Sequence, residues 1–204
     1  KHPEFEMDDR ILYPTDELTE GEQLLVDWLI KEFTQNRRLQ THIRFLLKSG
    51  SMYLVYNGNL LMHGCVPTEE DGTFSRVKVG DDLFSGCALY DRLDRVVRDA
   101  STGDEYAIDF MWYLWCGADS PSFDKAKMAT FERYLTTNKD VQKEPKGYYY
   151  KLQNEEFVCD NILKEFGIEA KRGHIINGHV PVKIKKGEHP VRANGKLIVI
   201  DGGF

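Results

Sequence analysis

Two short apolar runs separated by Asn57-Gly58 place the strongest constraint on how this chain can fold. Residues 52–56 and 59–63 are each too short for a stable helix and are bounded by turn residues. Asn-Gly accepts the positive φ angles of a type I′ turn, which joins two antiparallel strands in register. The pattern therefore predicts a β-hairpin whose second strand ends at His63.

A second apolar run, residues 174–177, is short and β-branched and stops at Gly178. It predicts a buried strand that delivers His179 to its carboxyl end, the end at which open α/β sheets bind ligands. Two of the six histidines, His63 and His179, thus follow apolar strands. Imidazole at such positions serves either as a metal ligand or as a hydrogen-bonded structural group, and the residues alone leave both interpretations open.

The C-terminal stretch adds a further hairpin signal. Ala193-Asn194-Gly195 predicts a turn of the Asn-Gly kind, and residues 196–200 form an apolar strand that stops at Asp201. Asp201 is a candidate ligand by position, although an Asp at a strand end more commonly caps a turn. Two imidazoles suit Mn, Fe or Zn, but a hydrolytic centre also needs carboxylates that bridge the metal ions. This chain offers few carboxylates in positions suited to that role.

Helical spacing dominates elsewhere. Thr19 and Glu22 match a capping box, which predicts a helix, and a second helix ends at Ser49-Gly50. After the acidic turn at 68–73 the pattern is helical for nearly a hundred residues. The first expected elements are a helix over 83–100, a helix capped by Asp104 that buries Ala107, Ile108, Met111, Leu114 and Trp115, and a short helix over 125–135. A loop over 145–150 follows, whose exposed aromatic residues most simply pack under the loop itself. The last expected helix is capped by Asn154 and ended by Gly167.

This order predicts an α/β (α+β) fold in which a helical insertion splits a sheet. Residues 1–17 form an irregular start within a helical lead-in, 1–50. The sheet elements fall in 51–67 and 171–204, and a mainly helical insertion occupies 74–170.

Composition narrows the classes of function. A formal net charge of −6 and a pI near 5.6 argue against a general nucleic-acid binder, which needs a basic surface. No apolar run reaches the roughly 20 residues of a membrane helix, and no signal peptide opens the sequence. The four cysteines form no CxxC pair, so we expect buried reduced thiols and a cytoplasmic protein. HExxH, GxSxG and Walker motifs are absent from the sequence, so zincins, α/β-hydrolases and P-loop enzymes have no support. The first residue is not Met, so we expect a fragment.

Four segments carry a resemblance to a known family. They are KHPEFEMDDRILYPT, YNGNLLMHGCVP, LWCG followed by SPSFDKAKMATFERY, and INGHVPVKIKKGEHPVRANGKLIVIDGGF. Together they resemble the bacterial class III fructose-1,6-bisphosphatases, a branch of the calcineurin-like metallophosphoesterases, over nearly the whole chain. The sequence departs from the family at Asp124, which stands where the family's SPxFGK motif has glycine.

The resemblance implies a sandwich fold with a dinuclear metal centre that hydrolyses the 1-phosphate of fructose 1,6-bisphosphate in gluconeogenesis. The GDxH, GDxxDR and GNH motifs of the superfamily are absent from this chain, whereas the two later histidines are present as His63 and His179. The chain would therefore be the C-terminal portion of the enzyme and would hold half of a site for two divalent ions, with manganese expected. Alone it would bind metal weakly or not at all and would be inactive without the missing N-terminal part.

The resemblance also implies cationic contacts to the sugar bisphosphate substrate. Lys127, Arg133 and Lys183 are the candidates, because charge-assisted donors must hold the distal phosphate, although each equally fits a solvated surface. Two alternatives stay open: a non-enzymatic interaction or regulatory module that docks a partner through Trp112 and residues 148–150, and another metallophosphoesterase such as a protein phosphatase. Assembly into a homo-oligomer also stays open.

Overall fold

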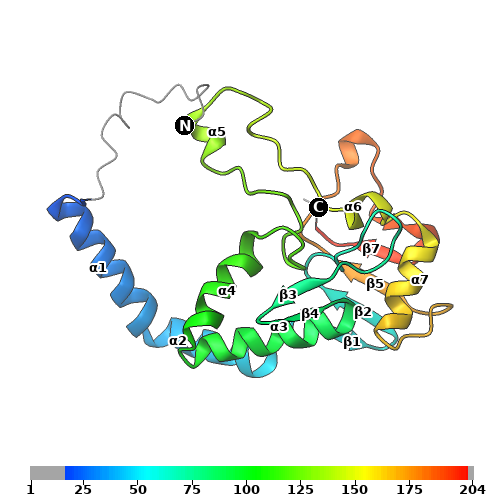
Figure 1. Ribbon diagram of the computed structural model, residues 1–204, viewed down its shortest axis with the longest axis horizontal. Helices are drawn as coiled ribbons and strands as arrows, with labels where there is room; N and C mark the ends of the chain where they lie inside the picture. Colours follow the sequence, from blue (N-terminus) through cyan, green and yellow to red (C-terminus); the bar gives the residue numbers. More distant parts are fainter. Residues whose placement is uncertain (1–16, 202–204) are drawn as a thin grey trace. The chain divides into compact units, whose positions relative to one another are not determined.

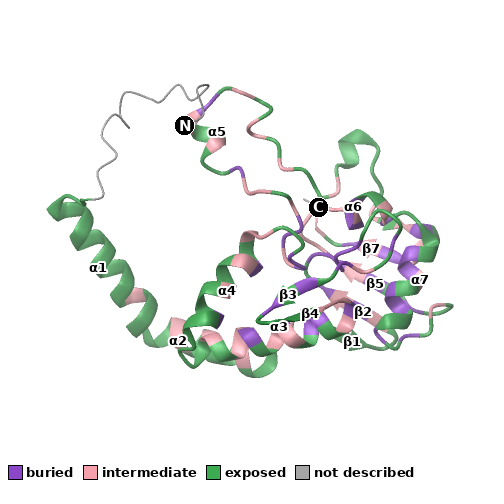
Figure 2. Ribbon diagram, viewed as in Figure 1, coloured by how far each residue is buried: buried purple, intermediate pink, exposed green. Residues whose placement is uncertain are grey.

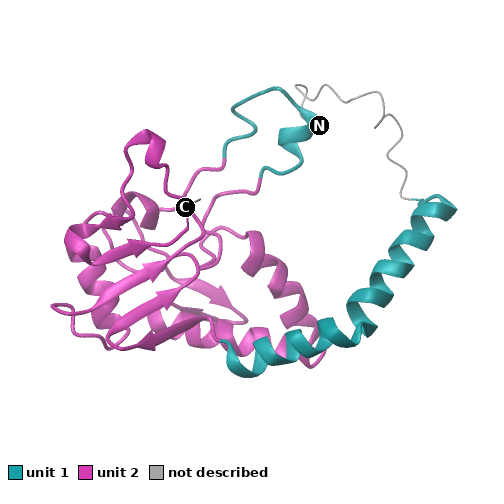
Figure 3. Cartoon of the chain, turned by 180° about the vertical axis from the view of Figure 1, so that it is seen from behind, with its two compact units in different colours: residues 1–50, 129–143 teal, residues 51–128, 144–204 magenta. Residues whose placement is uncertain are grey.

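A computed structural model describes residues 17–201 of the chain. The irregular start expected over 1–17 therefore lies outside the described residues, apart from Glu17. The chain divides into two compact units (Figure 3), one formed by residues 1–50 with 129–143 and the other by residues 51–128 with 144–204.

The smaller unit is helical. It contains α1 (Glu20–Gln35), α2 (Arg37–Ser49) and α5 (Glu132–Leu135). The capping box is confirmed, because Thr19 Oγ1 accepts from the Glu22 amide at 3.3 Å and the Thr19 amide donates to the Glu22 carboxylate at 2.7 Å. α1 contains no buried residue.

The predicted helix over 125–135 was wrong in extent, since only its last four residues are helical. Lys125 instead pairs with Lys146 in an isolated antiparallel bridge, and the Ala126 amide donates to the Pro145 carbonyl at 2.8 Å. Pairing with a segment about twenty residues away thus overrides the helix propensity of this stretch.

The larger unit is built on a five-stranded mixed sheet (Figure 1). Its strands, in spatial order, are β1 (Tyr53–Tyr56), β2 (Asn59–Met62), β5 (His174–Asn177), β7 (Leu197–Val199) and β6 (Val191–Arg192). β2, β5 and β7 run parallel, and β1 and β6 are antiparallel edges. β2 pairs with β5 although the segment between them is more than a hundred residues long, so one sheet is split by an insertion, as the element order predicted.

Both predicted hairpins are present. Asn57 has φ 50° and Gly58 has φ 75°, the two positive values that a type I′ turn requires. The second hairpin differs from the prediction in its turn. Arg192 pairs with Leu197, which leaves a four-residue loop whose first residue, Ala193, is buried in the core and also has positive φ. Burial of Ala193, rather than the Asn-Gly pair alone, sets this loop.

A second, two-stranded sheet was missed. β3 (Val77–Val79) and β4 (Asp82–Phe84) form a hairpin inside the stretch predicted to be helical, and Leu83 belongs to β4. Val77 and Val79 are buried and Lys78 is exposed, which is the alternation of a strand. Gly80 turns the chain with φ 69°. Three residues per strand are too few for the period to stand out in the sequence.

The helices of the larger unit are α3 (Gly86–Ser101), α4 (Glu105–Cys116), α6 (Tyr149–Leu152) and α7 (Glu156–Glu165), with short 3₁₀ turns at Ile184–Lys186 and Ala193–Gly195. Asp104 caps α4 as predicted, by accepting from the Ala107 amide at 2.8 Å. Asn154 does not cap α7, because Glu155 occupies that position and makes no side-chain cap bond. Gly167 follows the end of α7 with φ 71°.

One prediction of burial was wrong. On α4 only Ala107 and Leu114 are buried, because the helix packs mainly on α3, and Ile108, Met111 and Trp115 are exposed. In the segment 145–150 the aromatic side chains mostly pack, which was the simplest expectation: Tyr149 and Tyr150 are buried in the main core, at the start of α6.

The main core lies between the sheet and the helices that cover it (Figure 2). Leu60, Ile175 and Leu197, one from each central strand, are fully buried beside Ile162 and Leu163 of α7. Each such side chain contributes about 1.5–3 kcal/mol of hydrophobic stabilisation, so the parallel strands are held firmly.

The structure also shows whether any helix could span a membrane and whether the cysteines are paired. Among residues 17–201, no helix is long and apolar enough to cross a membrane. All four cysteines have free thiols, with Cys65 and Cys159 buried and Cys87 and Cys116 partly exposed.

Candidate metal centre

The two histidines that follow apolar strands lie together. β2 and β5 are parallel neighbours, so their carboxyl ends meet at one edge of the sheet. The Gly178 amide donates to the His63 carbonyl at 2.8 Å and continues the pairing beyond both strands. His63 Nε2 then lies 3.2 Å from His179 Nδ1, with the ring centroids 5.0 Å apart.

Local backbone geometry aims His179 at its partner. His179 has φ 66°, a left-handed conformation that costs a non-glycine residue about 1 kcal/mol or more and that concentrates at functional sites. The ring of Phe123 packs edge-on against it, with centroids 5.9 Å apart. His179 Nε2 is buried and has no hydrogen-bond partner within the described part of the chain.

Electrostatics favour a neutral His179. Burial is the largest cause that lowers the pKa of His179, and the nearby His63 and Lys125 lower it further. Asp201 and a hydrogen bond to the Phe123 backbone act in the opposite direction. The net shift is downward from 6.5, so the imidazole is neutral at pH 7. Neutral imidazole is the form that binds metal ions.

Asn177 and Gly64 hold the two strand ends in place. Asn177 is buried, and its Nδ2 donates to the Gly64 carbonyl at 2.7 Å and to the Tyr149 hydroxyl at 2.9 Å. A Cβ on Gly64 would lie 2.3 Å from the Pro121 carbonyl oxygen, so only glycine fits there. Sequence reasoning missed this support, whose signal was a polar side chain ending an otherwise apolar buried strand.

The separation of the two nitrogens fits ligands of one ion. Two nitrogens each about 2.1 Å from a metal, at angles of 90–109°, lie about 3.0–3.4 Å apart. His63 Nε2 and His179 Nδ1 are 3.2 Å apart, a distance that an imidazole–imidazole hydrogen bond would also give. Residues 17–201 contain no cluster of three or more His, Cys, Asp or Glu side chains placed to hold an ion. Within these residues, the two imidazoles alone do not make up a complete ligand set.

The three cationic candidates are divided between the two units. Lys127 and Lys183 belong to the larger unit, which carries the histidines, whereas Arg133 lies on α5 of the smaller unit. Lys183 is exposed, and its amide donates to Glu188 Oε2 at 3.1 Å. The pKa of Lys146 is lowered by burial first and by the charge of Lys183 second. Phosphate contact by these three side chains stays a prediction.

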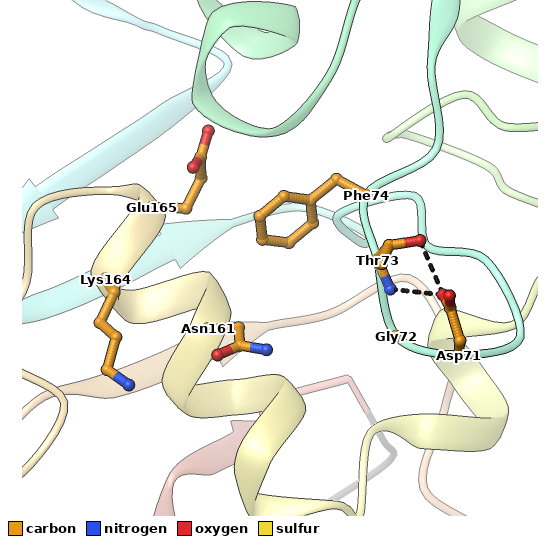
Figure 4. Close-up of a pocket in the computed structure, with 7 residues that line it drawn as sticks. All are labelled: Asp71, Gly72, Thr73, Phe74, Asn161, Lys164 and Glu165. Carbon is orange, nitrogen blue, oxygen red and sulfur yellow. Dashed lines mark hydrogen bonds between the residues drawn. The ribbon is translucent and has the colours of Figure 1, made fainter.

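A cavity of about 470 Å³ between residues 71–74 and α7 contains none of the predicted site residues (Figure 4). In this cavity the Asp71 carboxylate accepts hydrogen bonds from the amide and the hydroxyl of Thr73, at 2.9 and 2.7 Å, and thus stabilises its own loop. This cavity is therefore not part of the candidate centre.

Comparison with known proteins gives consistent matches. The profile of a family described as Firmicute fructose-1,6-bisphosphatase matches residues 1–204. A class 3 fructose-1,6-bisphosphatase of Clostridium novyi is 45% identical over 239 residues, covering 100% of this chain and 36% of that protein. One from Clostridium botulinum (strain Langeland) is 50% identical over 194 residues, covering 92% of this chain and 29% of that protein.

A third relative, from Porphyromonas gingivalis, is 45% identical over 240 residues and covers 100% of this chain and 37% of that protein. The chain thus spans about a third of the length of the curated relatives it matches. No solved structure matches it. These matches confirm the resemblance drawn from the sequence segments.

Proposed function

The chain belongs to the Firmicute fructose-1,6-bisphosphatase family, and on that premise we propose that it is the C-terminal part of a metal-dependent hydrolase that releases phosphate from fructose 1,6-bisphosphate. The observation that carries the proposal is the meeting of His63 and His179 at the carboxyl ends of two neighbouring parallel strands. The reaction would belong to gluconeogenesis in the cytoplasm.

In this proposal His63 and His179 hold a divalent cation through two ring nitrogens, and manganese suits a set that combines imidazole with carboxylate. When bound, the cation would polarise the phosphate ester and lower the pKa of a water molecule. The carboxylates and the general acid would come from the N-terminal part of the same protein, so this chain alone would be inactive.

The residues of this chain would prepare the site rather than complete it. Burial keeps His179 neutral and ready to bind. Asn177 and Gly64 fix the strand ends, which limits how far the two rings can separate. Phe123 covers one side of His179 and limits the access of water there.

Joining this chain to the missing N-terminal part and measuring phosphate release from fructose 1,6-bisphosphate with Mn²⁺ tests the proposal. We expect activity in the joined protein, none in the chain alone, and a loss of at least a hundredfold in His63→Ala and in His179→Ala. His42→Ala, an exposed histidine on α2, is the matched control and should keep full activity. Full activity in both site variants would rule out the two histidines as ligands.

A second candidate function is a non-enzymatic interaction or regulatory module. It is favoured by the exposed apolar side chains of α1, among them Leu24, Trp28 and Phe33, and by exposed Trp112 on α4. The burial of Tyr149 and Tyr150 removes part of the surface first considered for it. Persistent self-association on size-exclusion chromatography, combined with no gain of metal binding when the N-terminal part is added, would favour this function over the first.

A further inference from the structure

The larger unit contains an open pocket of about 340 Å³. The segment that follows α4 forms one wall and the segment around α6 forms another. The lysines and carboxylic acids that line it are Lys125, Lys146, Lys151, Glu69, Asp119 and Asp124. None of the three cations predicted from the sequence lines the pocket.

The segment after α4 connects this pocket to the candidate metal centre. The amide of Cys65, two residues after His63, donates to the Pro121 carbonyl at 2.9 Å. Phe123 then packs on the ring of His179, and the next two residues, Asp124 and Lys125, line the pocket. The Lys125 ammonium lies 4.9 Å from the centroid of the Phe123 ring. Residues 123–125 thus connect the ring of His179 with the lining of the pocket.

The lysines of the pocket differ in how their charge is balanced. Lys125 is paired with Glu144 at 2.9 Å. Lys146 and Lys151 instead lie over aromatic rings, at 5.5 Å from the Tyr150 centroid and 4.3 Å from the Tyr148 centroid. Within residues 17–201, neither has a carboxylate at ion-pair distance. Two ammonium groups without carboxylate partners favour an anion with several acceptor oxygens, such as phosphate.

Thr68 supplies an independent observation. It lines the pocket, its residue is only 4% exposed, and its hydroxyl makes no hydrogen bond to any described residue. A buried hydroxyl left unpaired destabilises the protein, and a hydrogen bond to a ligand hydroxyl would remove that penalty. The pocket thus combines cations for a phosphate with an unpaired polar group for the molecule that carries it.

We propose that this pocket binds the phosphorylated end of a sugar phosphate, with Lys146 and Lys151 on the phosphate that is not hydrolysed and Thr68 on a sugar hydroxyl. The identity of the sugar, fructose, rests on the proposed function. In this proposal one substrate would reach from the pocket to the histidine pair, with a different phosphate at each.

Equilibrium titration of this chain with fructose 6-phosphate, inorganic phosphate and fructose tests the proposal. A chelator keeps metal out of the experiment, so the histidines cannot hold phosphate through an ion. We expect fructose 6-phosphate to bind more tightly than inorganic phosphate and fructose not to bind. Lys146→Gln and Lys151→Gln should each weaken binding of fructose 6-phosphate about tenfold or more, since a charge-assisted bond is lost.

Two further variants sharpen the result. Lys164→Gln, which alters an exposed lysine of the other cavity (Figure 4), is the matched control and should bind like the unchanged chain. Thr68→Val keeps the shape of the side chain. It should weaken the binding of fructose 6-phosphate about threefold or more and leave the binding of inorganic phosphate unchanged. Lys146→Arg keeps the charge and should bind better than Lys146→Gln, which separates loss of charge from misfolding.

The proposal is overturned if both lysine variants keep the original affinity, or if fructose 6-phosphate does not bind. Equal binding of inorganic phosphate and fructose 6-phosphate with no effect of Thr68→Val would show a site for free phosphate and also overturn it. Because this binding is measured without metal or turnover, hydrolysis by the joined protein without binding in the pocket refutes only the pocket. Binding without hydrolysis refutes only the function.

Discussion

His63 Nε2 and His179 Nδ1 lie 3.2 Å apart although 116 positions separate the two residues in the chain. Their contact depends on the parallel pairing of β2 with β5 and on the Gly178 amide, which extends this pairing past both strands. The candidate site is therefore a property of the assembled sheet, and changes that loosen the sheet edge should weaken it as surely as changes to the rings.

The first prediction concerns metal affinity. His63→Ala or His179→Ala should lower the affinity of the joined protein for Mn²⁺ by at least tenfold, because each removes one of the two nitrogen ligands that this chain would supply. Titration calorimetry measures this affinity, as does the decrease of the electron paramagnetic resonance signal of free Mn²⁺ on binding. His42→Ala serves again as control. An unchanged affinity in both site variants would mean that the 3.2 Å contact is only a hydrogen bond.

The second prediction concerns Asn177. Asn177→Ala removes hydrogen bonds to the Gly64 carbonyl and the Tyr149 hydroxyl in a buried setting, so the free energy of unfolding should fall by about 2–3 kcal/mol. Urea denaturation measures the change. Asn154→Ala is a suitable control, because Asn154 is exposed and does not cap α7, and it should stay within about 0.5 kcal/mol. Equal effects would remove Asn177 from the support of the site.

The third prediction concerns Gly64. In Gly64→Ala the new methyl group would start 2.3 Å from the Pro121 carbonyl oxygen, so the backbone must shift and the protein should lose about 2 kcal/mol or more. Because His63 is the preceding residue, Mn²⁺ affinity should fall as well. Gly21→Ala should change the free energy of unfolding in the opposite direction. Gly21 lies in α1 with open space around it, and alanine there should stabilise the helix by up to about 1 kcal/mol.

The fourth prediction concerns Asp124. This residue has φ 45°, is 2% exposed, and its Oδ2 makes no hydrogen bond to the described residues. Asp124→Gly relieves both the backbone strain and the unpaired carboxylate, so it should raise the free energy of unfolding by about 1–3 kcal/mol. A loss of stability in Asp124→Gly would contradict this expected relief of strain.

The same carboxyl group should make stability depend on pH. Burial raises the pKa of Asp124 from 3.8 to about 6, and Asp119 adds to the shift while Cys65 opposes it. Because the folded-state pKa is the higher one, the stabilisation is complete below pH 3.8 and is lost as the pH rises through about 6. At about 1.4 kcal/mol per pKa unit, the change between pH 5 and pH 7.5 is about 1–2 kcal/mol.

Asp124→Asn isolates this effect. It keeps the positive φ but cannot ionise, so its stability relative to the unchanged chain should increase by about 1–2 kcal/mol from pH 5 to pH 7.5. Urea denaturation at both pH values measures the difference. A constant difference across this range would show that the carboxyl group titrates normally.

Local signals were enough for the elements whose stabilising partners lie within a few residues. The hairpin at Asn57-Gly58 needs only two positive φ angles, and the caps at Thr19 and Asp104 bond amides three residues away. Elements set by distant partners were mispredicted. Lys125 pairs with Lys146 instead of continuing a helix, and β3 and β4 are too short to show their period.

Burial was likewise decided by neighbours that the sequence does not reveal. The apolar residues of α4 look alike in the sequence, but only those that face α3 are buried. Tyr149 and Tyr150 follow a loop-like Pro-Lys-Gly segment and are buried in the main core, but the sequence did not show which side chains they would pack against.

Strand and turn signals are local, so the amino-acid sequence was enough to place His63 and His179 after short apolar strands, and its quoted segments pointed to the family. That these strands are parallel neighbours, with the two rings in contact, became visible only in the folded chain. The fold also sets which lysines share a pocket: Lys125, Lys146 and Lys151 come from segments that meet through backbone pairing across the fold. Such pairing depends on which buried surfaces fit together, and that is a property of the whole chain rather than of any one stretch.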